Sequence, residues 1–221
     1  LVLDDADIAK AVEGAIYGKY RNAGQTCICV NRFLVHEKIA AAFTEQLIAR
    51  SKALVVGDGS SPQTTVGPLI SDEAVSKVTR LIDSAKKEGA TISLAPTPQA
   101  HGSRFVSPCV ITGVTPTMSI WKEEIFGPVS TIATFSSDDE AIALANNTPH
   151  GLAAYVYSSD LARAMKISER LAYGMVGIND TAISSAQAPF GGIKESGFGR
   201  EGSMYGIDDY LVLKYLSVQM A

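Results

Sequence analysis

The sequence contains few cysteines, few histidines and no long apolar run. Three of the 221 residues are cysteine and three are histidine. Three cysteines are too few, and odd in number, for a disulfide framework. We therefore expect a reducing, cytoplasmic setting in which each thiol is either buried or reactive. Because the sequence has no run of about 18 apolar residues, no membrane-spanning helix is expected.

Neither sign of charge dominates, since 19 basic residues face 23 acidic ones and the net charge is -4. A basic face that binds nucleic acid is therefore not expected. The histidines are His36, His101 and His150, and none has a partner three or four residues away, so no metal site is expected. Hydrophobic residues make up 46% of the chain, which is enough for a sizeable core and excludes a disordered chain.

Helical and strand-like patterns alternate along the chain. Apolar residues spaced four apart predict helices around 8–16 and 39–47, and Ser71 precedes a third helix that Gly89 ends. Further helices are expected at Asp138–Asn146 and 161–171. The expected strands are 27–35, Thr91–Leu94, 105–111, Val129–Phe135, 153–157, Met175–Ile178 and 210–218. This alternation favours an α/β fold with a largely parallel sheet flanked by helices.

The first candidate for chemistry is the segment Gly-Gln-Thr-Cys-Ile-Cys at 24–29. A nucleophilic cysteine needs an exposed thiolate and nearby backbone N–H donors that can hold an oxyanion. Cys27 follows a glycine that permits a tight turn, and it precedes an extended segment. Judged from this spacing alone, Cys27 and Cys29 also suit the role of small core residues, because unpaired cysteines are usually buried.

Two further segments have functional potential. In Lys-Glu-Glu-Ile-Phe-Gly-Pro at 122–128, one of the two carboxylates could accept ribose hydroxyls while Phe126 packs a flat ring; a solvated acidic turn with a core phenylalanine is the alternative. The glycine-rich segment 189–201 lacks the residue order of a phosphate-binding loop. It lies within the long irregular stretch 179–202, and a loop of that length is usually functional.

Taken together, the order and spacing of these three segments resemble the aldehyde dehydrogenase superfamily over essentially the whole chain. The resemblance implies that Cys27 is the nucleophile that attacks the aldehyde. It implies that Glu124 binds the nicotinamide ribose of NAD or NADP, with Phe126 beside it. It also implies that Phe190 lines the substrate tunnel.

Within that superfamily, the segment Tyr-Arg-Asn-Ala-Gly-Gln-Thr-Cys-Ile-Cys-Val-Asn-Arg at 20–32 resembles the succinate-semialdehyde dehydrogenases. Arg21 is then expected to pair with the far carboxylate of a semialdehyde. Ser184 resembles the serine that helps to hold this carboxylate, with Ser185 as the alternative. Cys29 fits members of this branch that close a reversible disulfide with Cys27 under oxidation.

Three other functions stay open at this point. The same chemistry suits glutarate semialdehyde or a broad range of aliphatic aldehydes. From another class, the chain could be a non-catalytic α/β interaction module, or a binding protein for an acidic metabolite.

The resemblance also predicts a domain organisation. Residues 1–205 are expected to form the catalytic domain and residues 206–221 an oligomerisation strand of a homodimer or homotetramer. The general base, a glutamate in a Glu-Leu-Gly-Gly stretch, would lie upstream of Leu1, as would a second carboxylate-binding arginine. The dinucleotide-binding domain, which holds most of the cofactor, would lie there too. We therefore expect a C-terminal catalytic portion that does not turn over by itself.

Overall fold

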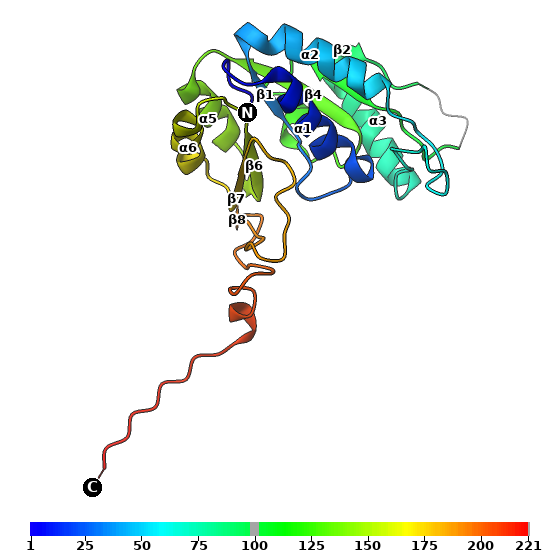
Figure 1. Ribbon diagram of the computed structural model, residues 1–221. Coiled ribbons are helices and arrows are strands. Elements are labelled where there is room, and N and C mark those ends of the chain that lie inside the picture. Colours follow the sequence, from blue (N-terminus) through cyan, green and yellow to red (C-terminus); the bar gives the residue numbers. More distant parts are fainter. Residues whose placement is uncertain (98–101, 221) are drawn as a thin grey trace.

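A computed structural model describes residues 1–97 and 102–220, so that His101 lies outside the described residues. Helices and strands alternate along the chain (Figure 1). The helices are α1 (Ile8–Tyr20), α2 (Glu37–Lys52), α3 (Asp72–Lys87), α4 (Ser119–Lys122), α5 (Asp138–Asn146) and α6 (Leu161–Arg170), with 3₁₀ turns η1 (Arg21–Gly24) and η2 (Asp208–Tyr210). The strands are β1 (Phe33–His36), β2 (Thr91–Leu94), β3 (Cys109–Thr112), β4 (Val129–Phe135), β5 (His150–Gly151), β6 (Ala153–Val156), β7 (Met175–Ile178) and β8 (Ile193–Lys194).

Local capping explains why the helices begin where the sequence predicts. The Ser71 hydroxyl accepts the Ala74 N–H at 3.2 Å at the start of α3, and acidic residues occupy the first turn. The Ser137 hydroxyl accepts the Glu140 N–H at 3.3 Å at the start of α5. The expected strands 27–35 and 105–111 are too long, because residues 27–32 and 105–108 form turns and irregular backbone instead.

The main sheet has the order β1-β4-β3-β2. β4 runs parallel to β1 and β3, and β2 is antiparallel to β3. β6 and β7 form a second parallel pair. Val2 joins the two sheets, because it forms parallel bridges to both Val35 and Tyr157. The expected largely parallel sheet is thus confirmed, with its continuity resting on residues 1–3.

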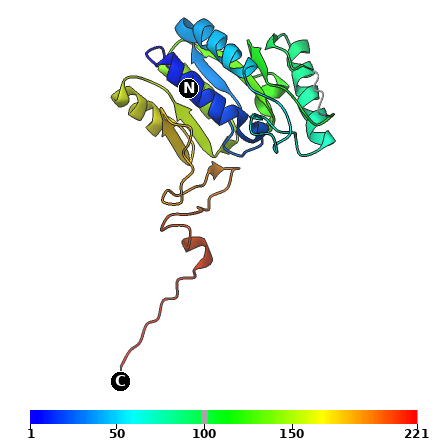
Figure 2. The same cartoon turned by 45° about the vertical axis from the view of Figure 1, so that its right-hand side comes forward.

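Helices cover both faces of the sheet (Figures 1 and 2). α1 and α2 pack on one face, where Val12 and Phe43 join Val35 and Ile132 in a buried cluster. α3, α5 and α6 supply the cluster on the opposite face, which includes Leu81. Burial on both faces suits the apolar runs of the central parallel strands. The cysteine-bearing segment follows α1 directly, so the packing of α1 on its face of the sheet positions this segment.

The C-terminal segment differs from the prediction. No strand forms at 210–218. Tyr210 is instead the last residue of the 3₁₀ turn Asp208–Tyr210, and residues 211–220 form no strand pairing with any other described part of the chain. Figure 1 shows this segment projecting away from the domain. Leu213 is fully exposed, and Val218 is 81% exposed. Extended, apolar residues become a strand only when a second strand supplies hydrogen-bond partners, and this chain offers none among its described residues.

A charged cluster fastens the start of the chain to α5 and α6. The Arg163 guanidinium donates to Asp4 at 2.8 Å, to Asp5 at 3.3 Å and to Asp138 at 2.5 Å. Asp5 also accepts the Ser158 hydroxyl at 2.7 Å. The hydrogen bond from Arg163 lowers the pKa of Asp4 below its usual value. The ionised form of Asp4 is therefore favoured by folding.

The variant Arg163→Met should lower the free energy of unfolding by about 2 kcal/mol at pH 7, because it leaves half-buried carboxylates without their cation. The stabilisation that Asp4 contributes is complete above its unfolded pKa of about 4 and is lost as the pH falls through the lower folded value. The difference between the two proteins should thus shrink toward pH 3. Urea unfolding at both pH values measures it, with Arg50→Met on the exposed side of α2 as control. An equal difference at pH 3 and pH 7 would contradict the assignment.

Candidate active site

The cysteine-bearing segment begins with an unusual backbone path. After α1, Asn22, Ala23 and Gly24 adopt left-handed conformations with φ of 53°, 55° and 77°. A Cβ atom added at Gly24 would lie 2.3 Å from the Gly127 carbonyl oxygen. Glycine is therefore required here for its conformation and because two backbones meet. This contact places the first and second sequence motifs side by side.

Cys27 lies in a tight turn closed by the Cys29 N–H, which donates to the Thr26 carbonyl at 3.0 Å. In a trans peptide the N–H points opposite to the C=O, so the Cys27 N–H points away from this turn. No acceptor for it exists among the described residues, and the Cys27 side chain is exposed. An exposed thiol beside a free N–H is the arrangement that stabilises an oxyanion formed by attack of the sulfur.

Asn31 ties this segment to the acidic motif. Its side-chain amide donates to the Glu123 carbonyl at 3.1 Å and accepts the Ile125 N–H at 2.9 Å. Arg80 holds the Glu123 carboxylate through two hydrogen bonds of 3.1 and 2.7 Å. Glu124, between these anchored neighbours, leaves its carboxylate exposed. No local pattern points to Asn31, because its partners lie more than 90 residues away.

Phe126 follows in the same turn with a φ of 53°, and its side chain is 37% exposed. A left-handed conformation at an aromatic residue is uncommon and turns the ring outward from the core. The exposed Glu124 carboxylate and the exposed Phe126 ring suit a sugar hydroxyl and a flat face of a nucleotide. These two residues therefore fit the cofactor contact expected of them.

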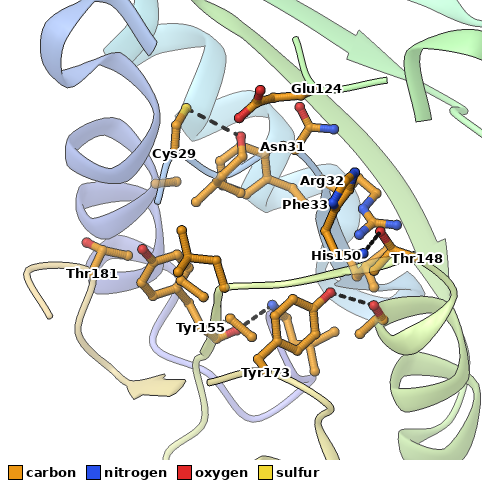
Figure 3. Close-up of a pocket in the computed structure, with 18 of the residues that line it drawn as sticks. Cys29, Asn31, Arg32, Phe33, Glu124, Thr148, His150, Tyr155, Tyr173 and Thr181 are labelled. Carbon is orange, nitrogen blue, oxygen red and sulfur yellow. Dashed lines mark hydrogen bonds between the residues drawn. The ribbon is translucent and has the colours of Figure 1, made fainter. Parts of the chain in front are cut away.

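A cavity of about 390 Å³ has Cys27 in its wall, and Figure 3 labels other residues that line it, among them Cys29 and Glu124. Cys27, Cys29 and Glu124 line one part of it. The rest is bounded by the first residues of β1 and β6 and by Ala11 and Ala15 of α1. The structure thus brings together three of the residues singled out from the sequence, from two separate motifs.

The first residues of the chain lie between β1 and β6. The Val2 N–H donates to the Leu34 carbonyl at 2.8 Å, and the Leu1 carbonyl accepts the Tyr157 N–H at 2.9 Å. Residues 1–3 therefore run between the two strands, and Leu1 and Val2 line the cavity.

Two buried polar groups border the cavity. Trp121 lines it, and its buried indole N–H has no acceptor among the described residues. The Leu1 nitrogen donates to the Tyr155 carbonyl at 2.7 Å.

The predicted substrate-binding residues lie outside the cavity wall. Arg21 is exposed, donates to the Tyr17 hydroxyl at 3.0 Å and lies 5.1 Å from the centre of its ring. Ser184 is exposed in the irregular segment after β7. Phe190 is half-buried and pairs its backbone with Glu201 at 2.9 and 2.7 Å. Their roles in substrate binding stay predictions.

The glycine-rich segment is organised by one arginine. Arg200 donates through Nη1 to the carbonyls of Gly192, Phe198 and Gly199 at 2.8 to 2.9 Å. A Cβ atom at Gly191 would lie 2.3 Å from the Gly199 carbonyl oxygen. The glycines here let the loop fold closely on itself around a guanidinium. They do not present a row of free N–H groups to a phosphate.

Among residues 1–97 and 102–220, no group of three or more His, Cys, Asp or Glu side chains is arranged to hold a metal ion. His36 is buried and caps α2, where its Nδ1 accepts the Lys38 N–H at 3.3 Å. Within the same described ranges, no helix has the length and apolar character that crossing a membrane requires.

The model of the aldehyde dehydrogenase family matches residues 1–216. The chain belongs to the aldehyde dehydrogenase family. A 3-sulfolactaldehyde dehydrogenase of Pseudomonas putida is 49% identical over 98% of this chain and 44% of its own length. A glutarate-semialdehyde dehydrogenase of the same species is 48% identical over all of this chain and 45% of its own.

Solved structures agree with this membership. The crystal structure of a succinate-semialdehyde dehydrogenase from Burkholderia pseudomallei superposes with a TM-score of 0.94 at 52% identity. The match covers 97% of this chain and 45% of that one. The aldehyde dehydrogenase fold expected from the sequence is thereby confirmed. The chain spans less than half the length of the relatives it matches.

Proposed function

We propose that this chain is the catalytic portion of an NAD(P)-dependent aldehyde dehydrogenase that oxidises succinate semialdehyde to succinate. The observation that carries the proposal is the exposed Cys27 thiol, with its free backbone N–H, beside the exposed Glu124. The sulfur of Cys27 adds to the aldehyde carbon to give a thiohemiacetal, whose oxygen the Cys27 N–H stabilises. Loss of hydride leaves a thioester, and water then releases the acid and the free thiol.

NAD or NADP supplies the hydride acceptor in this reaction. Glu124 is the residue that would bind the nicotinamide ribose, through hydrogen bonds from sugar hydroxyls to its carboxylate. Phe126 would pack beside it. A flexible acidic turn would serve this role poorly, and here Asn31 and Arg80 both fix the turn through Glu123.

The substrate assignment depends on Arg21. The aldehydes named for the relatives above, 3-sulfolactaldehyde and glutarate semialdehyde, carry an acidic group, as does succinate semialdehyde. An exposed guanidinium six residues before Cys27 can pair bidentately with such a group. Ser184 would add a hydroxyl donor. Glutarate semialdehyde, one carbon longer, is the second candidate substrate, because the same cation would bind its carboxylate.

The test compares kcat/KM for succinate semialdehyde and butyraldehyde in a protein that contains residues 1–221 together with a dinucleotide-binding domain, followed by NAD(P)H absorbance. An arginine–carboxylate contact worth about 1.5–3 kcal/mol predicts a preference of roughly 10- to 150-fold for the acid. A ratio near one would remove the substrate assignment and leave aldehyde oxidation. No activity on either aldehyde would favour a non-catalytic module.

We further propose that the cavity between β1 and β6 is filled in the active enzyme by an extended segment that completes the sheet. The 221-residue chain alone should then produce no NAD(P)H.

The apolar segment 211–220 is the candidate surface for pairing with a second subunit, since an unpaired extended edge binds another strand readily. A cytoplasmic location suits the three free cysteines.

A further inference from the structure

A tyrosine on a neighbouring strand reaches the loop that carries Cys27. The Tyr155 hydroxyl donates to the Ile28 carbonyl at 2.8 Å, and the two residues are 127 positions apart in the sequence. Tyr155 lies on β6 and lines the cavity near Cys29 (Figure 3). It is 9% exposed, and Ile28 is 6% exposed. A buried carbonyl depends on such a donor, because water cannot replace it.

We propose that Tyr155 is a positioning residue for the nucleophile, a role that rests on Cys27 acting as the nucleophile. The Cys27 side chain and N–H have no hydrogen-bond partners among the described residues, so only its neighbours in the chain fix its position. The nearest fixed point after Cys27 is the Ile28 carbonyl. The Tyr155 hydroxyl holds this carbonyl inward, which limits rotation of the planar peptide group about the adjoining φ and ψ angles.

A second hydrogen bond holds the loop at another carbonyl, two residues after that of Ile28. The Lys19 ammonium, on the fully buried side chain of α1, donates to the Val30 carbonyl at 2.9 Å. The two donors come from different elements, α1 and β6, on either side of the loop. The loop is thus clamped between a helix and a strand, and the exposed Cys27 lies just before the clamp.

The Tyr155 hydroxyl is suited to act as a permanent donor. Burial raises its pKa well above the usual value for tyrosine, and the charge of Arg21 opposes only part of this rise. The hydroxyl therefore keeps its proton at every pH at which the enzyme would work. Tyr155 also contacts Leu1 through its own carbonyl, at 2.7 Å. One residue thereby links Leu1 to the nucleophile loop.

The test uses Tyr155→Phe in an active enzyme that contains residues 1–221, and the matched control is Tyr173→Phe. Tyr173 also lines the cavity and donates to a backbone carbonyl, that of Ala145 on α5 at 2.6 Å, but it donates to no carbonyl of the cysteine loop. Each variant loses one hydrogen bond from a tyrosine hydroxyl to a backbone carbonyl, buried for Tyr155 and partly buried for Tyr173, so both melting temperatures should fall. Only Tyr155→Phe should lower kcat, by about tenfold, with KM for the aldehyde changed less than about twofold.

Four outcomes would overturn the proposal. Equal kcat values in the two variants would show that Tyr155 only stabilises the fold. A rise in KM with unchanged kcat would make it a substrate-binding residue. Cys27→Ser is assayed in parallel, and its full activity would rule out Cys27 as the nucleophile and this inference with it. An inactive Cys27→Ser together with a fully active Tyr155→Phe would rule out the role of Tyr155 and leave Cys27 as the nucleophile.

Discussion

Replacement of Cys27 by serine should lower kcat for aldehyde oxidation by at least about 10⁴-fold. A serine hydroxyl stays protonated near neutral pH, and no base among the described residues contacts this position, so it attacks the carbonyl far more slowly than a thiolate does. The exposed position of Cys27 makes the substitution harmless to packing. The measurement is NAD(P)H absorbance with succinate semialdehyde, together with the melting temperature of the variant. A loss of less than about tenfold would show that the chemistry does not pass through this sulfur.

Cys29→Ser is the matched control for that experiment. The Cys29 thiol donates to the Lys19 carbonyl at 3.6 Å and to the Val30 carbonyl at 3.8 Å, and a serine hydroxyl can make the same contacts. Its kcat should stay within about threefold of the parent enzyme. The pair also tests the predicted redox switch. Peroxide should remove two hydrogens from the peptide that holds Cys27 and Cys29, and the Cys29→Ser variant should show no such loss.

Gly24→Ala should lower the free energy of unfolding by at least about 3 kcal/mol. The new Cβ would lie 2.3 Å from the Gly127 carbonyl oxygen and 3.1 Å from that of Lys19, and backbone atoms cannot move aside as a flexible side chain does. The φ of +77° adds the strain of a left-handed alanine. Because the same contact joins the Cys27 loop to the turn of Glu124, affinity for the cofactor should fall as well. Urea unfolding and cofactor titration measure the two effects.

Two other glycines separate the effect of the left-handed φ from the effect of the close backbone contact. Gly89 has a φ of +102° with open space around it, so Gly89→Ala should cost only about 1 kcal/mol. Gly67 has open space and no left-handed φ, so Gly67→Ala should be close to neutral. If Gly24→Ala proves no more costly than Gly89→Ala, the close approach of the two backbones is not a constraint on this fold.

The helices were predictable because their signals are local. A serine at 71 or 137, acidic residues in the next turn and apolar residues at helical spacing all act within a few residues of each other. The same holds for Val129–Phe135, whose seven residues match the predicted strand. The turn at Cys27 was harder to predict, because 27–35 has a β-rich composition and two of the hydrogen bonds to this segment come from the distant Tyr155 and from Lys19.

The C-terminal segment shows the limit of local pattern. Its residues from 210 to 218 have the composition of a strand, yet a strand is a property of two segments and not of one. In this chain they stay extended and exposed. The glycine-rich motif is a similar case, because the sequence could not show that Arg200 would occupy its carbonyls.

By itself, the sequence determined the helices, most strand positions and the family. The helices and strands depend on residues close together in the chain. The family is identified from the order and spacing of motifs, which can be seen without a structure. Only the tertiary structure decided that Val2 joins two sheets, that Gly24 meets Gly127, and that Cys27 and Glu124 line one cavity. The first two features arise from contacts between residues 33 to 155 positions apart. No local preference encodes such contacts, since they form only after the helices and strands have packed into one core.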